Sequence, residues 1–441
     1  MTGPTHGPDD EDRLARIALT WLAEPGNRTV WTMVRAAGAE AALRRLLRGD
    51  VPDPELQASV SARVSVADPR EVALTAMERS ERLGARRVVP DDPEWPPSVS
   101  SLSNLDLHRA DRVSRDTLPP LCLWVRGPWS LAEALQRAVG VVGSRAATSY
   151  GLHVTAEIAF GLAEREWTVV SGGAFGIDAA AHRAALTAGG LTVAVLASGV
   201  DRPYPMGNAA LFDQIAEQGL LVSEWPPGSE PLRHRFLIRN RVIAAATAGT
   251  VLVEAAVRSG ARQTMARVLA LGRSAMVVPG PVTSAMSVGC HEVLRQHENA
   301  RVVTGLPHVL EEVGRIGYDL APVIRGPEHP RDGLDEESAL VLEAVPRRGT
   351  VGPEQLAARA GVALRVVLRR LSVLEAAGLI IRRSSGYALA VRPRRTRSPE
   401  TAQQDTAQQE TTQQETTQNE AAQHQPPRTP RRQETPLWVD D

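Results

Sequence analysis

The chain has 441 residues, 50 of them basic and 51 acidic, a length that suffices for two or three domains. No lysine occurs, which excludes a P-loop lysine, a Schiff-base lysine and a lysine general base. A cationic contact to a phosphate would therefore use a guanidinium group.

Residues 10–84 are predicted to form a small helical domain. Helical spacing is present in R-L-A-R-I-A-L-T-W-L and W-T-M-V-R-A-A-G, with a break at Pro25-Gly26-Asn27 between them. This break is a poor copy of a helix-hairpin-helix, whose two glycines it lacks. From 86 to 130, prolines and short apolar runs favour extended segments that lead into a sheet.

Residues 85–306 are predicted to form a Rossmann-like α/β domain. From residue 138 onward, continuous apolar runs alternate with helical patterns, at 138–144, 167–171, 191–197, 220–224, 250–254, 275–279 and 301–303. This alternation indicates a parallel sheet covered on both faces. Ligands of such sheets bind at the carboxyl ends of the strands.

The remaining chain divides into three parts. Residues 307–334 are predicted to be a linker, and 335–392 show the three helices and hairpin of a winged-helix domain. We expect Leu364, Val367, Leu368 and Leu371 to form the core face of its third helix. Arg365 and Arg369 leave open whether this helix contacts DNA or protein. The Gln/Thr-rich tail, 393–441, has almost no apolar residues and is predicted to be disordered.

Neither a disulfide framework nor a zinc site is expected, because Cys122 and Cys290 stand apart from any C-x-x-C pair or His/Cys cluster. No run of about 18 apolar residues occurs, so we expect no membrane partner. The polar, acidic N-terminus lacks the pattern of a signal peptide. The expected location is the cytoplasm.

Two glycine-rich turns lie in the middle of the chain, V-G-S-R (142–145) and S-G-G-A-F-G-I-D (171–178). Each follows an apolar run and opens a helical pattern. Glycine permits close approach of the backbone, and free N–H groups at a helix start suit phosphate. The first turn is not G-x-G-x-x-G, and the second strand lacks the acidic residue that holds a ribose. We therefore expect no NAD and no other cofactor.

The residues of these turns allow more than one role. Arg145 could contact a phosphate or form a structural ion pair. Gly172 and Gly173 are expected to face a ligand. Phe175 could belong to the core or stack on a base. Asp178 is expected to cap its helix.

The segment R-H-R-F-L-I-R-N-R, Arg233 to Arg241, is the densest basic stretch of the α/β region. On a helix, Arg239 and Arg241 point roughly 200° apart, so at most one should face a groove with the glycine turns. The other should pair internally, with Glu224 or Glu254 as candidates. Guanidinium groups beside an aromatic ring fit a groove for single-stranded nucleic acid.

No nucleophile–base–acid set is evident. Ser171, Ser198 and Ser223 end strands, but none lies in G-x-S-x-G. His182 and His234 lack an identifiable carboxylate partner.

Seven sequence blocks, in order, resemble the DNA-processing protein A family, also called DprA or Smf. The resemblance runs from about Val88 to Val303, and the helical and winged-helix regions also fit the family's layout. The blocks are V-G-S-R…Y-G (142–151), S-G-G-A-F-G-I-D-A-A-A-H (171–182), V-L-A-S-G-V-D-R-P-Y-P-x-x-N (195–208), S-E-W-P-P-G (223–228), R-F-L-I-R-N-R-V-I-A (235–244), V-E-A-A-x-R-S-G-A (253–261) and V-P-G (278–280).

This resemblance implies an extended Rossmann fold that binds single-stranded DNA and forms a homodimer. It also implies loading of RecA recombinase onto incoming strands during natural transformation, without catalysis. The DNA contacts that it implies by motif position are Ser144, Arg145, Gly172, Gly173, Phe175, Gly176, Asn208, Arg235, Phe236, Arg239, Asn240 and Arg241.

The sequence departs from the family at three places. Arg235 stands where the family often has histidine, and Met206 stands where relatives often carry lysine. Arg262 is an added cation that could supply the charge that Met206 lacks.

Two rival functions stay open. A phosphoribohydrolase-like nucleotide hydrolase would use P-G-G-x-G-T-x-x-E, but the comparable region has only Gly249-Thr250 and Glu254. A transcription factor would be led by the winged helix.

Overall fold

The computed structural model describes residues 8–105, 118–315, 319 and 334–390. The chain divides into two compact units, Met1–Ile324 and Arg325–Asp441. The helical and sheet regions that the sequence separated at residue 85 belong to the first unit. The tail expected to be disordered lies outside the described residues.

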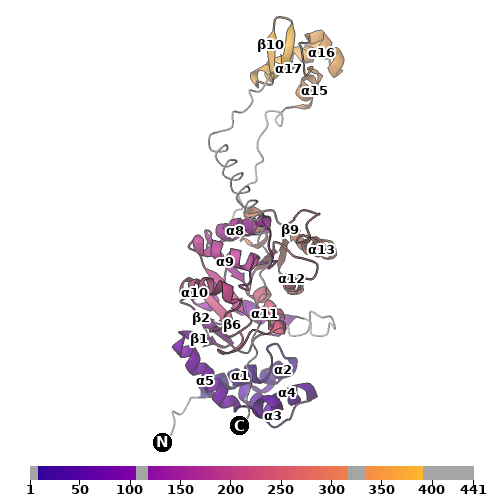
Figure 1. Ribbon diagram of the computed structural model, residues 1–441. Helices are drawn as coiled ribbons and strands as arrows, with labels where there is room; N and C mark the ends of the chain where they lie inside the picture. Colours follow the sequence, from indigo (N-terminus) through magenta and orange to yellow (C-terminus); the bar gives the residue numbers. More distant parts are fainter. Residues whose placement is uncertain (1–7, 106–117, 316–318, 320–333, 391–441) are drawn as a thin grey trace, which may run out of the picture. The chain divides into compact units, whose positions relative to one another are not determined.

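Five helices form the N-terminal region, as predicted: α1 (Pro8–Leu22), α2 (Arg28–Ala37), α3 (Ala39–Leu47), α4 (Pro54–Val64) and α5 (Pro69–Arg82). Side-chain caps define several of their starts. Asn27 accepts from the Val30 amide, and Asp53 and Asp68 each precede a proline at the first helical position. In Figure 1 these helices lie beside the β1 and β2 end of the sheet.

A nine-stranded sheet follows, in the order β1-β2-β6-β5-β4-β3-β7-β8-β9. Strands β3 to β9 are parallel, while β1 pairs antiparallel with β2 and β2 with β6, at one edge. This confirms the predicted extended Rossmann-like sheet. The strands are β1 (Ala85–Val88), β2 (Leu123–Arg126), β3 (Ala138–Val142), β4 (Thr168–Ser171), β5 (Thr192–Leu196), β6 (Leu220–Ser223), β7 (Gly249–Leu252), β8 (Ser274–Val277) and β9 (Ala300–Val302).

Helices cover both faces of the sheet (Figure 1). On one face α8 (Ser149–Ala163) and α9 (Ile177–Thr187) bury Ile158 and Ala181. On the other, α11 (Arg233–Ala246), α12 (Gly260–Ala270) and α13 (Val288–Gln296) bury Ile243, Met265 and Val293. Helix α10 (Ala209–Gln218) packs near β5 and β6. The short helices are α6 (Pro97–Ser100), η1 (Ser101–Asn104), α7 (Leu131–Ala134) and η2 (Met206–Asn208). The order of the strands reverses between β3 and β7, where doubly wound folds bind their ligands.

The predicted linker begins too early. Residues 306–313 form helix α14 (Leu306–Val313), which buries Val309 and Leu310 against the α8 side of the sheet. Leu306 packs where Gly161 of α8 leaves room. The sheet region therefore extends at least to Val313, because these apolar side chains complete its core.

The second unit has helices α15 (Glu336–Ala344), α16 (Pro353–Ala360) and α17 (Leu364–Ala376), then the antiparallel hairpin β10 (Ile380–Arg383) and β11 (Gly386–Leu389). This is the order expected of a winged helix. The expected core face of α17 is wrong in part. Its buried stripe is Val367, Leu371 and Leu374, whereas Leu364 and Leu368 are exposed. Leu368 is one residue, or 100°, beyond the centre of that stripe.

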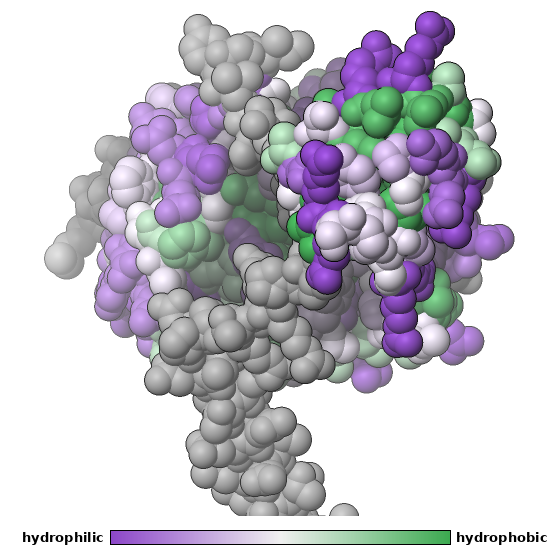
Figure 2. Space-filling view, turned by 90° about the horizontal axis from the view of Figure 1, so that it is seen from above, coloured by the Kyte–Doolittle hydropathy of each residue, from purple (hydrophilic) through white to green (hydrophobic). Residues whose placement is uncertain are grey.

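Among the described helices, none is long and apolar enough to cross a membrane. On the coloured surface in Figure 2, hydrophilic residues alternate with hydrophobic patches.

Candidate nucleic-acid interface

A cavity of about 750 Å³ opens at the carboxyl end of β3, between the two glycine turns and the starts of α11 and α12. It lies at the point where the strand order reverses. The residues lining it are Val142, Gly143, Ser144, Arg145, Ala146, Ala174, Asp178, Tyr204, Pro231, Arg233, Phe236, Leu237, Arg239, Asn240, Ile243, Ala256, Arg258, Ser259, Gly260, Ala261, Thr264 and Met286.

The two glycine turns pack directly against each other. Gly176 has a φ of 75°, and a side chain there would collide with the carbonyl oxygens of Ser144 and Arg145. The Ile177 amide donates to the Ser144 oxygen at 3.2 Å. The Ser144 hydroxyl in turn accepts from the Ala146 amide at 3.2 Å. The second turn therefore holds the first turn in place, and Gly176 serves this packing.

The sequence predicted that Gly172 and Gly173 face a ligand, and the structure differs. Both are buried, and the space that a side chain would need is filled by the Arg239 guanidinium at Gly172 and by the Phe212 ring at Gly173. These glycines are required because two large side chains cover the turn.

Asp178 does not cap its helix. The N-cap position of α9 is Gly176, and Asp178 reaches back to accept from the amides of Gly172 at 3.2 Å and Ala174 at 3.4 Å. Burial raises the pKa of this carboxyl, against the opposite effect of Arg239. Asp178 therefore fixes the shape of the second turn from inside.

Arg239 of α11 and Arg145 of the first glycine turn both bring guanidinium groups to the cavity. Arg239 is only 5% exposed and donates to the Val195 carbonyl oxygen. Burial lowers its pKa to about 10, which leaves it protonated at neutral pH. Arg145 is exposed and lies over the Phe236 ring, 5.4 Å from the centroid. Within the described chain Arg145 forms no ion pair, so the structural ion pair considered for it is not found.

Tyr204 and Phe236 line the cavity, and Phe175 lies beside it, next in the chain to the lining residue Ala174. Phe236 is half-buried and meets Tyr204 edge to face, with 5.7 Å between centroids. Phe175 is 48% exposed, next to Gly207, which excludes a core role for it. With one face of Phe236 under Arg145, the exposed ring of Phe175 is the better platform for a base.

Arg241 is not available to a ligand, in contrast to the sequence prediction. It is 0% exposed and donates to both carboxylate oxygens of Glu224, at 2.7 and 2.8 Å. The angular argument had placed at most one of Arg239 and Arg241 in the groove. The structure identifies Arg239 as that residue, because Arg241 points to the end of β6.

Three further predicted contacts have structural partners. Arg235 is held by Glu24 of the N-terminal region, at 2.8 and 3.2 Å, away from the cavity. Asn208 is buried and donates to the Gly173 carbonyl oxygen at 3.0 Å. Asn240 lines the cavity, and its amide donates to the Gly260 carbonyl oxygen at 3.4 Å, next to the start of α12.

The DNA contacts that the resemblance implied leave out two arginines of the cavity, although the basic stretch predicted from the sequence began at Arg233. Arg233 and Arg258 both line it and are exposed. Arg258 could have been found from its place just before Ser259, the N-cap of α12.

The prediction that Arg262 supplies the charge that Met206 lacks was also wrong. Arg262 bonds to the Val257 carbonyl oxygen at 2.6 Å and does not line the cavity. Arg183 is the exposed guanidinium near Met206, at 3.5 Å from the Asn208 amide oxygen.

The lining is strongly cationic. It contains four arginines and one carboxylate, Asp178, which accepts hydrogen bonds from two backbone amides. The lining contains neither histidine nor cysteine. Such a surface suits a polyanion.

The two histidines considered earlier lie elsewhere. His182 is buried with a pKa lowered by burial to about 3, and His234 does have a carboxylate neighbour, Glu24, at 3.6 Å.

Comparison with known proteins agrees with this geometry. The family model for DNA recombination-mediator protein A matches residues 86–314. A Mycobacterium tuberculosis protein named for DNA processing, DprA, is 44% identical over 381 residues, which cover 84% of this chain and 95% of that protein. The chain belongs to the DNA recombination-mediator protein A family.

A solved structure of this family is similar in fold. The crystal structure of DprA from Streptococcus pneumoniae has a TM-score of 0.55 and 29% identity, and the match covers 69% of this chain and 98% of that one. DprA from Helicobacter pylori, whose structure is described for its single-stranded DNA binding mode, has a TM-score of 0.42 and 24% identity over 51% of this chain and 94% of that one.

Proposed function

We propose that this member of the DNA recombination-mediator protein A family binds single-stranded DNA in the cavity at the β3/β7 reversal. The observation that carries the proposal is the convergence of Arg145, Arg233, Arg239 and Arg258 on one concave surface. Guanidinium groups bind phosphate oxygens with two parallel hydrogen bonds, and a row of them tracks a sugar–phosphate backbone.

The aromatic rim supports a preference for single strands. Phe175 and Tyr204 are both nearly half exposed. Stacking on such rings needs bases that are not already stacked in a duplex, and every base offers a suitable face. We therefore expect binding without strong sequence preference.

The wider role follows from the family resemblance. We propose that the protein protects incoming DNA and loads RecA recombinase during natural transformation, as a homodimer in the cytoplasm. Support for this part comes from family membership and from the seven motif blocks, of which the cavity contains the basic and glycine-rich members.

A non-enzymatic mode of action belongs to the same proposal. The described cavity lining offers the hydroxyls of Ser144, Tyr204, Ser259 and Thr264, but neither histidine nor lysine to act as their base. The single carboxylate accepts hydrogen bonds from two backbone amides. Incubation with nucleoside monophosphates tests the hydrolase alternative, and release of free base would favour it.

Fluorescence anisotropy with a labelled oligonucleotide tests the DNA proposal. Wild-type protein should bind single strands more tightly than duplex, with affinity falling steeply as salt rises. Arg145→Ala and Arg258→Ala should each weaken binding and reduce the salt dependence. Arg295→Ala is the matched control, because that arginine is exposed and lies outside the lining. Unchanged single-strand affinity in the first two variants would refute the groove, and sequence-specific duplex binding would favour the transcription factor.

RecA loading needs its own assay. RecA filament formation on single strands covered by single-strand-binding protein should be faster with the wild-type chain than without it, and slower with Arg145→Ala than with wild type. Equal filament rates with and without the chain would contradict the mediator role, while leaving DNA binding intact.

A further inference from the structure

The start of α11 is electrostatically unfavourable when considered alone. Its N-cap, Leu232, provides no side-chain hydrogen bond, and no acidic residue lies in its first turn. Instead the helix opens with Arg233, His234 and Arg235. Positive side chains at the positive end of the helix dipole destabilise a first turn. The first turn of α11 therefore needs a negative partner from elsewhere in the fold.

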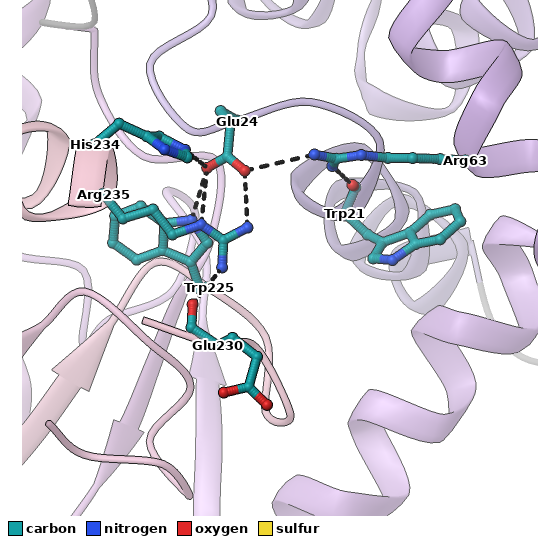
Figure 3. A network of polar contacts seen from close by, with 7 residues as sticks. All are labelled: Trp21, Glu24, Arg63, Trp225, Glu230, His234 and Arg235. Atoms are coloured by element: carbon teal, nitrogen blue, oxygen red, sulfur yellow. Dashed lines mark hydrogen bonds and ion pairs between the residues drawn. The ribbon is translucent and has the colours of Figure 1, made fainter. Parts of the chain in front are cut away.

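Glu24, in the turn between α1 and α2, supplies that partner from 211 residues away. Its carboxylate accepts from Arg235 at 2.8 and 3.2 Å and from the Trp225 indole nitrogen at 3.0 Å. His234 and Arg63 lie at 3.6 and 3.5 Å from it. Figure 3 shows these side chains converging on the one carboxylate. The α11 start is thus tied to the N-terminal helices.

Further contacts hold Arg235 in position beside Glu24. Arg235 is 11% exposed, donates to the Glu230 carbonyl oxygen at 2.9 Å and lies over the Trp225 ring. Burial alone would raise the pKa of Glu24, but the hydrogen bonds from Arg235 and Trp225 outweigh it, and the net pKa is lowered. The carboxylate is therefore ionised at neutral pH.

The opposite side of the same helical turn builds the cavity. Arg233, Phe236 and Leu237 line it, and Arg145 lies over the Phe236 ring. His234 and Arg235 face Glu24, while their immediate neighbours in the chain face the cavity. A displacement of this turn would move the Phe236 ring and, with it, the guanidinium that rests on it.

We propose that Glu24 is a positioning residue for DNA binding, acting through Arg235 to fix the first turn of α11 and so the placement of Phe236 and Arg145. The inference rests on the proposed function of the cavity. Glu24 itself does not line the cavity. Through this positioning Glu24 should increase the affinity for DNA. An ordinary surface carboxylate should decrease that affinity, because its negative charge repels the phosphates.

Glu24→Gln tests this difference in sign. Removal of a negative charge should leave binding to a polyanion unchanged or make it tighter, whereas loss of positioning should weaken it. We expect single-strand affinity five- to twentyfold below wild type, with an unchanged salt slope because no phosphate contact is lost. Glu40→Gln is the matched control, since that carboxylate lies in the same helical region, its side chain is 43% exposed, and its ion pair among the described residues is with Arg44, at 3.1 Å.

A double-mutant cycle with Phe236→Ala gives a second readout. If Glu24 acts through this ring, Glu24→Gln should add little to the loss that Phe236→Ala already causes. Folding is checked by circular dichroism at the assay temperature. If the glutamine variant folds poorly, Glu24→Asp keeps the charge on a shorter side chain, and weaker binding is again expected.

Wild-type or tighter binding by folded Glu24→Gln would overturn the inference, and so would full additivity with Phe236→Ala. Failure of the proposed function has a different signature, since Arg145→Ala would then leave single-strand affinity unchanged.

Discussion

The buried pair of Arg241 and Glu224 allows a sharp test of which arginine of α11 meets DNA. The perturbation is Arg241→Met, which replaces the arginine by an unbranched apolar side chain without the charge. Arg241 is 0% and Glu224 2% exposed, with two hydrogen bonds joining them. The substitution leaves a fully buried carboxylate without its cation.

The magnitude follows from that burial. Removal of one partner of a buried ion pair costs about 3–5 kcal/mol. At about 2–4 °C per kcal/mol for a large domain, the melting temperature should fall by roughly 6–20 °C. Burial already raises the pKa of Glu224 against the effect of Arg241. Without Arg241, the Glu224 carboxyl can avoid the cost of a buried negative charge by taking up a proton. A raised pKa favours the folded state at low pH, so the deficit should be smaller at pH 5 than at pH 8.

Urea and thermal denaturation measure the stability, and anisotropy at a temperature where the variant is folded measures DNA binding. Single-strand affinity should stay within about twofold of wild type, since Arg241 does not reach the cavity. Arg241→Met combined with Glu224→Leu should recover most of the stability, because an apolar pair can replace a buried ion pair. A variant of wild-type stability that has lost DNA affinity would refute the reasoning.

Four further outcomes are expected. Gly172→Ala should push aside the guanidinium that covers the turn and weaken single-strand binding about tenfold or more in anisotropy, the loss of a charge-assisted hydrogen bond being worth about 1.5–3 kcal/mol. Phe175→Ala should lose about 1–3 kcal/mol of single-strand affinity, whereas Phe175→Tyr should bind as wild type does. An affinity of Phe175→Ala equal to that of wild type would exclude stacking on this ring. Because the pKa of Glu24 is lowered, its stabilising effect should be present above pH 4.5 and lost as the pH falls further, so the melting temperatures of wild type and Glu24→Gln should converge in acid. Burial raises the pKa of both Cys122 and Cys290 to about 12, so neither thiol should react with a disulfide reagent at pH 8 until urea unfolds the chain.

The sheet could be predicted because its strands are buried on both faces and therefore appear as uninterrupted apolar runs. The seven parallel strands lie where those runs occur. Helical spacing likewise predicted the N-terminal helices. The periodicity of α17 was less decisive, because Leu364 and Leu368 are apolar yet lie outside the buried stripe.

The site was predicted in part, since local geometry is encoded locally and tertiary partners are not. Helical angles alone showed that Arg239 and Arg241 could not share one groove. They could not show that Glu24 captures Arg235 from across the chain, or that Arg239 covers Gly172. A glycine pair has the same appearance in the sequence whether a ligand or a buried side chain fills the space above it.

The absence of lysine has a consequence for the deepest cation of the cavity. The same burial that brings the Arg239 pKa to about 10 would act on a lysine from an ordinary value near 10.4. An ammonium group there would titrate close to physiological pH and spend part of its time neutral. The guanidinium over the glycine turn stays protonated near neutral pH because its pKa is still about 10, so changes in cellular pH should alter the affinity of the cavity for an anion very little.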